Sequence, residues 1–156
     1  MPYQVVAISE DVACQVRTTL KSPQYGHPAH VEVAAGYGPC RYCLQTFVEG
    51  QEERILFTYN AFSEVGGWPA PGPVFIHREE CKRFEGAGFP PKLRPLPLVL
   101  EGYGRGSWRL IQEPVVNGDI DAVIDRLFAH PAVEYIQVRN AEAGCFVARI
   151  ERASSS

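Results

Sequence analysis

The chain has 156 residues and a mass of 17.3 kDa, which is enough for one domain that buries a core without disulfides or metal. Its 15 Lys and Arg against 18 Asp and Glu give a net charge of −3, which excludes the strongly basic balance of a dedicated nucleic-acid binder. The five cysteines are the compositional feature with the most chemical content.

The N-terminal segment 1–8 has neither the basic region nor the long apolar stretch of a signal peptide, and it is typical of a first strand. No apolar run approaches the roughly 18 residues needed to span a bilayer. We therefore expect a soluble cytoplasmic protein without a membrane partner. In a reducing cytosol, free thiols or metal ligands are favoured over disulfides, and an odd count leaves at least one cysteine unpaired.

Two principal helices are predicted, one near each end of the chain. The first covers about residues 9–21, because Ser9 can cap it, Glu10 suits its positive end and apolar residues follow at helical spacing. The second covers about 118–130, where apolar residues starting at Ile120 recur at i+3, i+4, i+7 and i+8 and form one helix face.

Strands are expected where β-branched and aromatic residues gather or apolar and polar residues alternate: 1–8, 30–35, 40–48, 54–59, 73–77, 96–103, 108–116, 133–140 and 144–151. Two hairpins are expected, around 49–52 and around 141–143. Seven of the 13 prolines lie between Pro69 and Pro97, so this region should be irregular surface, with one or two helical turns at 79–84. The fold class is α+β: one domain over 1–152 with a mainly antiparallel sheet, two helices and a C-terminal hairpin, and a frayed tail at 153–156.

Four soft or borderline ligands have a spacing that suits tetrahedral zinc. Cys40 and Cys43 form a Cys-x2-Cys pair, and His77 and Cys81 form a His-x3-Cys pair after 33 intervening residues. A Gly-Pro turn before Cys40 matters, because residues three apart on a flat strand point to opposite faces. Buried cysteines also serve as small apolar side chains, so plain core packing remains the alternative to a structural zinc site.

The terminal hairpin offers a second group of residues with chemical potential. Strict alternation along its strands places Phe146 on an apolar face, and places Arg139, Cys145 and Val147 on the opposite face. Guanidinium groups on that face can hold a carboxylate or a phosphate, and they can lower the pKa of a nearby thiol. A solvated sheet face with a half-buried cysteine is the alternative without function.

Three motif segments resemble the bacterial domain-of-unknown-function family 1203. They are Gly-Pro-Cys-Arg-Tyr-Cys-Leu at 38–44, Gly-Pro-Val-Phe-Ile-His at 72–77 with Cys81, and Val-Arg-Asn at 138–140 with Cys145. The resemblance runs from about Tyr3 to Arg152 and implies one cytosolic domain with no assigned reaction. The family often has His where this chain has Tyr42 and Gln137. The residues of this chain within the motif segments are Arg41, Cys43, His77, Cys81, Arg139 and Cys145, which marks where a site is expected.

The first functional hypothesis is a pocket for a small anionic ligand, with Arg41, Cys43, His77, Arg139 and Cys145 as the ligand-binding residues. The second is a thiol-dependent enzyme in which Cys43 or Cys145 is the nucleophile and His77 is the base. The third is the structural zinc domain. The residues alone leave open whether the protein is an enzyme and whether it forms a homodimer, whereas no nucleic-acid partner is expected.

Overall fold

The computed structural model describes residues 3–36, 38–62 and 71–153, in which every strand pairing is antiparallel. The elements in chain order are β1 (Tyr3–Val6), α1 (Glu10–Thr19), β2 (His30–Val33), β3 (Glu53–Asn60), β4 (Pro71–His77), the short 3-10 turn η1 (Pro91–Leu93), β5 (Leu98–Tyr103), the turn η2 (Arg105–Ser107), β6 (Arg109–Pro114), α2 (Ile120–Phe128), β7 (Tyr135–Asn140) and β8 (Phe146–Arg152). This architecture confirms the predicted α+β class. From residue 154 onward, the predicted tail lies outside the described residues.

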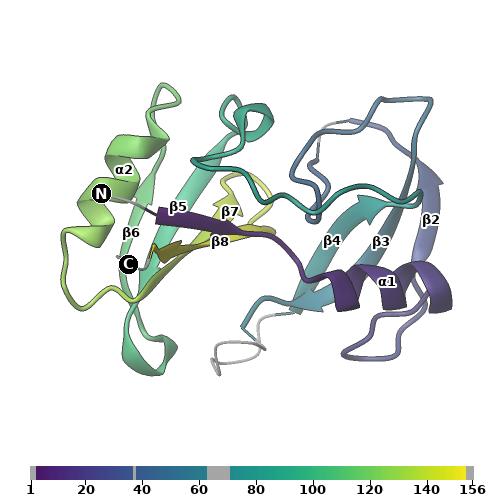
Figure 1. The fold of residues 1–156 in the computed structure, drawn as a ribbon, viewed down its shortest axis with the longest axis horizontal. Coiled ribbons are helices and arrows are strands. Elements are labelled where there is room, and N and C mark those ends of the chain that lie inside the picture. Colours follow the sequence, from purple (N-terminus) through teal and green to yellow (C-terminus); the bar gives the residue numbers. More distant parts are fainter. Residues whose placement is uncertain (1–2, 37, 63–70, 154–156) are drawn as a thin grey trace.

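The strands form two sheets that lie side by side (Figure 1). The five-stranded sheet has the order β1-β8-β7-β5-β6 and carries α2, whereas the three-stranded sheet has the order β2-β3-β4 and carries α1. The two sheets meet where β4 contacts β8. Neither helix has the length and apolar character required to cross a membrane, over the residues described.

Each sheet has its own hydrophobic core. The apolar stripe of α2 packs on the five-stranded sheet, where Ile124 and Ile136 are fully buried. Burial of a side chain of this size stabilises the fold by about 1.5–3 kcal/mol. The other core lies between α1 and the three-stranded sheet, where Val16 packs with residues of β3 and β4, and this core also contains Cys40 and Cys43.

Both helices lie within their predicted ranges. The Ser9 hydroxyl oxygen accepts a hydrogen bond of 3.3 Å from the backbone N–H of Val12, which satisfies one of the free donors at the start of α1. At the other end, Leu20 adopts a left-handed conformation with φ 53° and its N–H bonds to the Val16 carbonyl, so the chain leaves the helix before Ser22.

The predicted strand at 40–48 is wrong, because this segment is a turn. The Cys40 N–H donates to the Gln45 carbonyl at 2.9 Å, and the Leu44 N–H donates to the Cys40 carbonyl at 2.9 Å. Leu44 has φ 57°, in the left-handed region that a strand cannot contain. Strand β3 therefore pairs with β2 and β4, not with this segment. The segment 79–84 contains no helical turn, so the predicted helical turns there are also wrong.

A β-bulge in the terminal hairpin changes the predicted faces. Val138 is paired with Ala148, and Arg139 with Phe146, so Val147 is an extra residue in β8. As a result Phe146 turns toward the three-stranded sheet, with its ring 5.7 Å from that of Tyr59, and Val147 joins the core beneath α2. The predicted positions of these two side chains are wrong. The face opposite α2 is also largely buried rather than solvated.

Candidate metal centre

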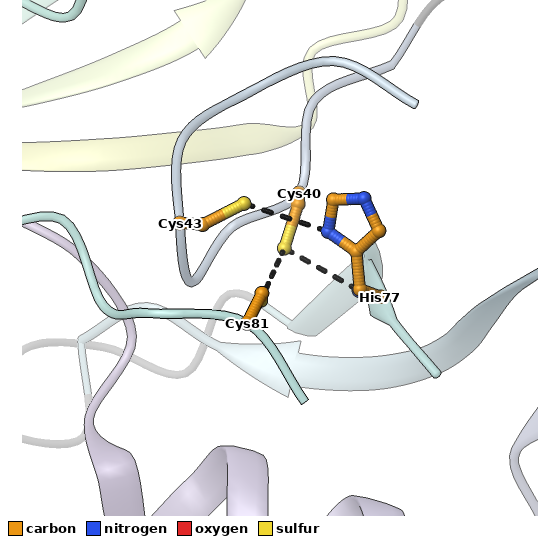
Figure 2. Close-up of side chains that lie close together, drawn as sticks. All are labelled: Cys40, Cys43, His77 and Cys81. Atoms are coloured by element: carbon orange, nitrogen blue, oxygen red, sulfur yellow. Dashed lines mark hydrogen bonds between the residues drawn. The ribbon is translucent and has the colours of Figure 1, made fainter. Parts of the chain in front are cut away.

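The structure brings together the four residues of the Cys-x2-Cys and His-x3-Cys pairs (Figure 2). One ligand atom from each of Cys40, Cys43, His77 and Cys81 lies within 4.8 Å of all the others. The Cys40 and Cys81 sulfur atoms are 3.9 Å apart, and the Cys43 sulfur is 3.4 Å from Nδ1 of His77. The cysteine pair comes from the turn, His77 ends β4, and Cys81 lies on the irregular segment that follows.

The turn conformation explains how Cys40 and Cys43 come to face the same way. The left-handed Leu44 reverses the chain, and its side chain is fully buried in the core beneath α2, which anchors the turn. The N–H of His77 donates to the Cys40 sulfur at 3.3 Å, so the turn is joined to the end of β4. An extended chain would have placed the two cysteines on opposite faces.

Two of the distances between ligand atoms fit the edges of a tetrahedral zinc site. Zinc–sulfur bonds of about 2.3 Å and zinc–nitrogen bonds of about 2.0–2.1 Å put two sulfurs about 3.8 Å apart and a sulfur and a nitrogen about 3.6 Å apart. The observed 3.9 Å and 3.4 Å lie within about 0.2 Å of these tetrahedral edges. Three thiols and an imidazole also suit a borderline-soft ion, whereas magnesium and calcium prefer oxygen ligands.

Two charged residues contact the cluster from outside. Nε2 of His77 is 3.2 Å from Glu52 Oε2, and the other oxygen of this carboxylate accepts a 2.7 Å hydrogen bond from the Val48 N–H. Arg17, in the last turn of α1, donates to the Cys81 sulfur at 3.1 Å and to the His77 carbonyl at 3.0 Å. The sequence interpretation missed Arg17 and Glu52, because no local motif marks them and both reach the cluster through tertiary packing.

The cluster already separates charge without a metal. Burial raises the pKa of Cys40, but hydrogen bonds with Cys43 and Cys81 outweigh it, so the net pKa of Cys40 is lowered. Hydrogen bonding with Cys40 and Cys81 raises the pKa of Cys43, and similar contacts raise the pKa of His77 to about 10. These shifts describe a Cys40 thiolate beside a protonated His77, and a metal ion bound at Nδ1 would take the place of that proton.

Cys81 lies between two cavities. One of about 490 Å³ is lined by Cys43, Phe47, Glu52, His77 and Cys81 among others, and one of about 340 Å³ lies on the α1 side. Cys81 lines both cavities, and it is half-buried, whereas Cys40 is fully buried.

The predicted ligand-binding residues divide between different places. Cys43 and His77 belong to the cluster, but Arg139 and Cys145 line a separate cavity of about 270 Å³ beside β4. Arg139 donates to the Glu101 carboxylate at 2.6 Å. Burial lowers the pKa of Arg41 to about 10, and its guanidinium donates to two main-chain carbonyl oxygens at 2.7 and 2.8 Å. The five predicted ligand-binding residues therefore do not gather around one of the cavities described here. The small anionic ligand stays a prediction.

No curated protein and no solved structure matches the chain. A family does match it over residues 37–152, a range that contains all four residues of the cluster and the terminal hairpin. The match covers most of the chain and bears out the resemblance carried by the Gly-Pro-Cys-Arg-Tyr-Cys-Leu and Gly-Pro-Val-Phe-Ile-His segments. The chain belongs to the family described as "Protein of unknown function (DUF1203)".

Proposed function

We propose that the protein is a zinc-binding domain in which Cys40, Cys43, His77 and Cys81 hold one structural zinc ion. The observation that carries the proposal is the convergence of four zinc-type ligand atoms within 4.8 Å of one another, with two of their distances matching tetrahedral edges. The ion would connect the turn, the end of β4 and the segment after it. Backbone hydrogen bonds from Arg41 N–H to the Phe75 carbonyl and from Phe84 N–H to the Tyr42 carbonyl already join these stretches.

The surroundings of the cluster support a complete zinc site. Three thiolates and a neutral imidazole around Zn²⁺ carry a net charge of −1, which is costly to bury without a compensating group. Arg17 supplies a positive charge 3.1 Å from the Cys81 sulfur. With Nδ1 of His77 as the ligand atom, the Nε2–H donates to Glu52, an arrangement that orients metal-binding histidines.

Four protein ligands fill the tetrahedral coordination of zinc and leave no position for a water or a substrate. Catalytic zinc sites typically have three protein ligands and one open position, whereas closed sites stabilise folds. The ligand set of this protein therefore supports a structural role. A small anionic ligand remains compatible with this role, and Arg139 in its separate cavity would be the anchor.

Metal analysis of the protein purified under reducing conditions tests the proposal. We expect about one equivalent of zinc, and cobalt substitution should give the visible absorption of a tetrahedral thiolate site. Cys40→Ser should lose both signals. Cys145→Ser is the matched control and should keep both, because Cys145 lies outside the cluster. Protein that holds no zinc after exposure to excess metal, and gives no cobalt–thiolate absorption, would overturn the proposal.

A thiol-dependent enzyme is the second candidate, because the Cys43 sulfur lies within 3.4 Å of Nδ1 of His77. The raised pKa of Cys43 works against it, since the nucleophile must be a thiolate. Iodoacetamide labelling of the metal-free protein separates the two candidates. Preferential alkylation of Cys43 supports the enzyme, and protection of the whole cluster by one equivalent of zinc supports the metal site. Cys145, the other nucleophile proposed from the sequence, lies apart from the cluster and from His77, its proposed base.

A further inference from the structure

The cysteines of the cluster differ in their exposure to solvent. Cys40 is 0% exposed and Cys43 is 7% exposed, whereas Cys81 is half-buried and lines a cavity on each side. A small oxidant therefore reaches the Cys81 sulfur first. We propose that Cys81 is a site of oxidation by hydroperoxides and that Cys40 resolves it to a disulfide. The consequence of this oxidation, release of the metal ion, rests on the proposed zinc site.

The positions of the sulfur atoms select Cys40 as the resolving thiol. Its sulfur is 3.9 Å from that of Cys81. The Cys43 sulfur also lies within 4.8 Å of Cys81, but it contacts Nδ1 of His77 at 3.4 Å (Figure 2). A disulfide of about 2.05 Å requires the two sulfurs to approach by about 1.9 Å. Cys40 belongs to a turn and Cys81 to an irregular segment outside both sheets, so this approach breaks no strand pairing.

The chemistry is a two-electron oxidation in two steps. The Cys81 thiolate attacks one oxygen of hydrogen peroxide, the O–O bond breaks, hydroxide leaves and Cys81 becomes a sulfenic acid. The Cys40 thiolate then attacks the Cys81 sulfur, the S–O bond breaks, a second hydroxide leaves and the disulfide forms. The two thiolates together lose two electrons, and one peroxide is reduced to two hydroxide ions.

The disulfide would remove two of the four zinc ligands, so the ion should leave. Cys40 and Cys81 are 41 residues apart, and the new bond closes the same loop that the metal had closed. The oxidised chain would therefore keep its fold while releasing zinc. Reduction of the disulfide would restore the ligands, which makes the change reversible.

Peptide mapping tests this inference directly. Arg41 lies between Cys40 and Cys43, so trypsin separates them, and Arg78 and Lys82 isolate Cys81 in its own peptide. We treat zinc-loaded protein with increasing hydrogen peroxide, follow released zinc with a coloured chelator and map disulfides by mass spectrometry. The expected result is one zinc ion released per Cys40–Cys81 disulfide, with recovery of zinc binding after dithiothreitol. Cys14→Ser and Cys145→Ser serve as matched controls and should behave as the unaltered protein does.

A different disulfide, such as Cys40–Cys43, or irreversible oxidation of Cys81 without a disulfide would overturn the inference. The same mapping on reduced, metal-free protein distinguishes this failure from failure of the proposed function. If the protein binds no zinc but still forms the Cys40–Cys81 disulfide, the zinc site is wrong and the oxidation site stands. If zinc binds and peroxide yields another product, the zinc site stands and the oxidation site is wrong.

Discussion

Removal of the proposed zinc ion should lower the thermal stability of the protein, and the loop size gives the scale of the loss at a fixed concentration of free zinc. Cys40 and Cys81 are 41 residues apart, and a cross-link that closes a loop of this size stabilises a fold by about 4 kcal/mol through chain entropy. For a chain of about 150 residues, each kcal/mol corresponds to roughly 2–4 °C in Tm. We therefore expect Tm to fall by about 8–16 °C on chelation.

Circular dichroism in a reducing buffer, with and without a zinc chelator, measures this shift. Free zinc is held by a metal buffer at about 1,000 times Kd, where mass action also gives about 4.1 kcal/mol, and each tenfold change in free zinc should then change the stability by about 1.4 kcal/mol. Cys81→Ser should have a low Tm that no longer responds to chelator, whereas Cys145→Ser should respond as the unaltered protein does. A Tm that stays constant while zinc content falls from one equivalent to none would refute the reasoning.

Three further predictions concern contacts around the metal centre and in the five-stranded sheet. Arg17→Met and Glu52→Gln should each weaken zinc binding by roughly 10–100-fold in chelator competition, because Arg17 contacts the Cys81 sulfur and Glu52 contacts the His77 ring. A zinc affinity equal to that of the unaltered protein would contradict a supporting role for these two residues. Burial raises the pKa of Glu101, but hydrogen bonds and charge from its arginine partners outweigh burial, so the pKa of Glu101 is lowered overall. The ionised carboxylate therefore stabilises the fold fully at pH values well above the ordinary Glu pKa of about 4.3. This stabilisation is lost as the pH falls through the lowered pKa of the folded state. Glu101→Gln should therefore cost about 2–4 kcal/mol in urea unfolding at pH 7 and less at acidic pH, and a pH-independent loss would count against the ion pairs. Gly102→Ala should cost about 1–3 kcal/mol in the same assay, because its Cβ would lie 2.9 Å from the Ile111 side chain, and an unchanged midpoint would show that the sheet adjusts freely.

The elements set by local periodicity were predictable from the sequence. The apolar stripe from Ile120 defines α2, and Ser9 caps α1, because both features depend on residues within one or two turns. The turn at 40–48 was not predictable from composition, since its aromatic and β-branched residues favour a strand. Its conformation depends on Leu44 in the left-handed region, which is stabilised by burial of the Leu44 side chain against residues far away in the chain.

The candidate site was predictable in its ligands but not in its surroundings. Spacing identifies Cys40, Cys43, His77 and Cys81, because a metal site imposes short-range constraints on each pair. Arg17 and Glu52 carry no such constraint and are 60 and 25 residues from His77 along the chain. The faces of the terminal hairpin also depend on a bulge, which alternation alone does not reveal.

The distribution of the five cysteines favours a metal centre over a reactive pair or scattered core thiols. Core packing alone would bury sulfur among aliphatic side chains, yet Cys40 and Cys81 face each other and a histidine, with a guanidinium and a carboxylate held against the group. A reactive pair needs only two of these residues, and it gains nothing from two further thiols that raise the pKa of Cys43. A metal ion uses all four ligands and requires a compensating charge. Arg17 provides that charge, whereas Cys145 lies apart and Cys14 is exposed.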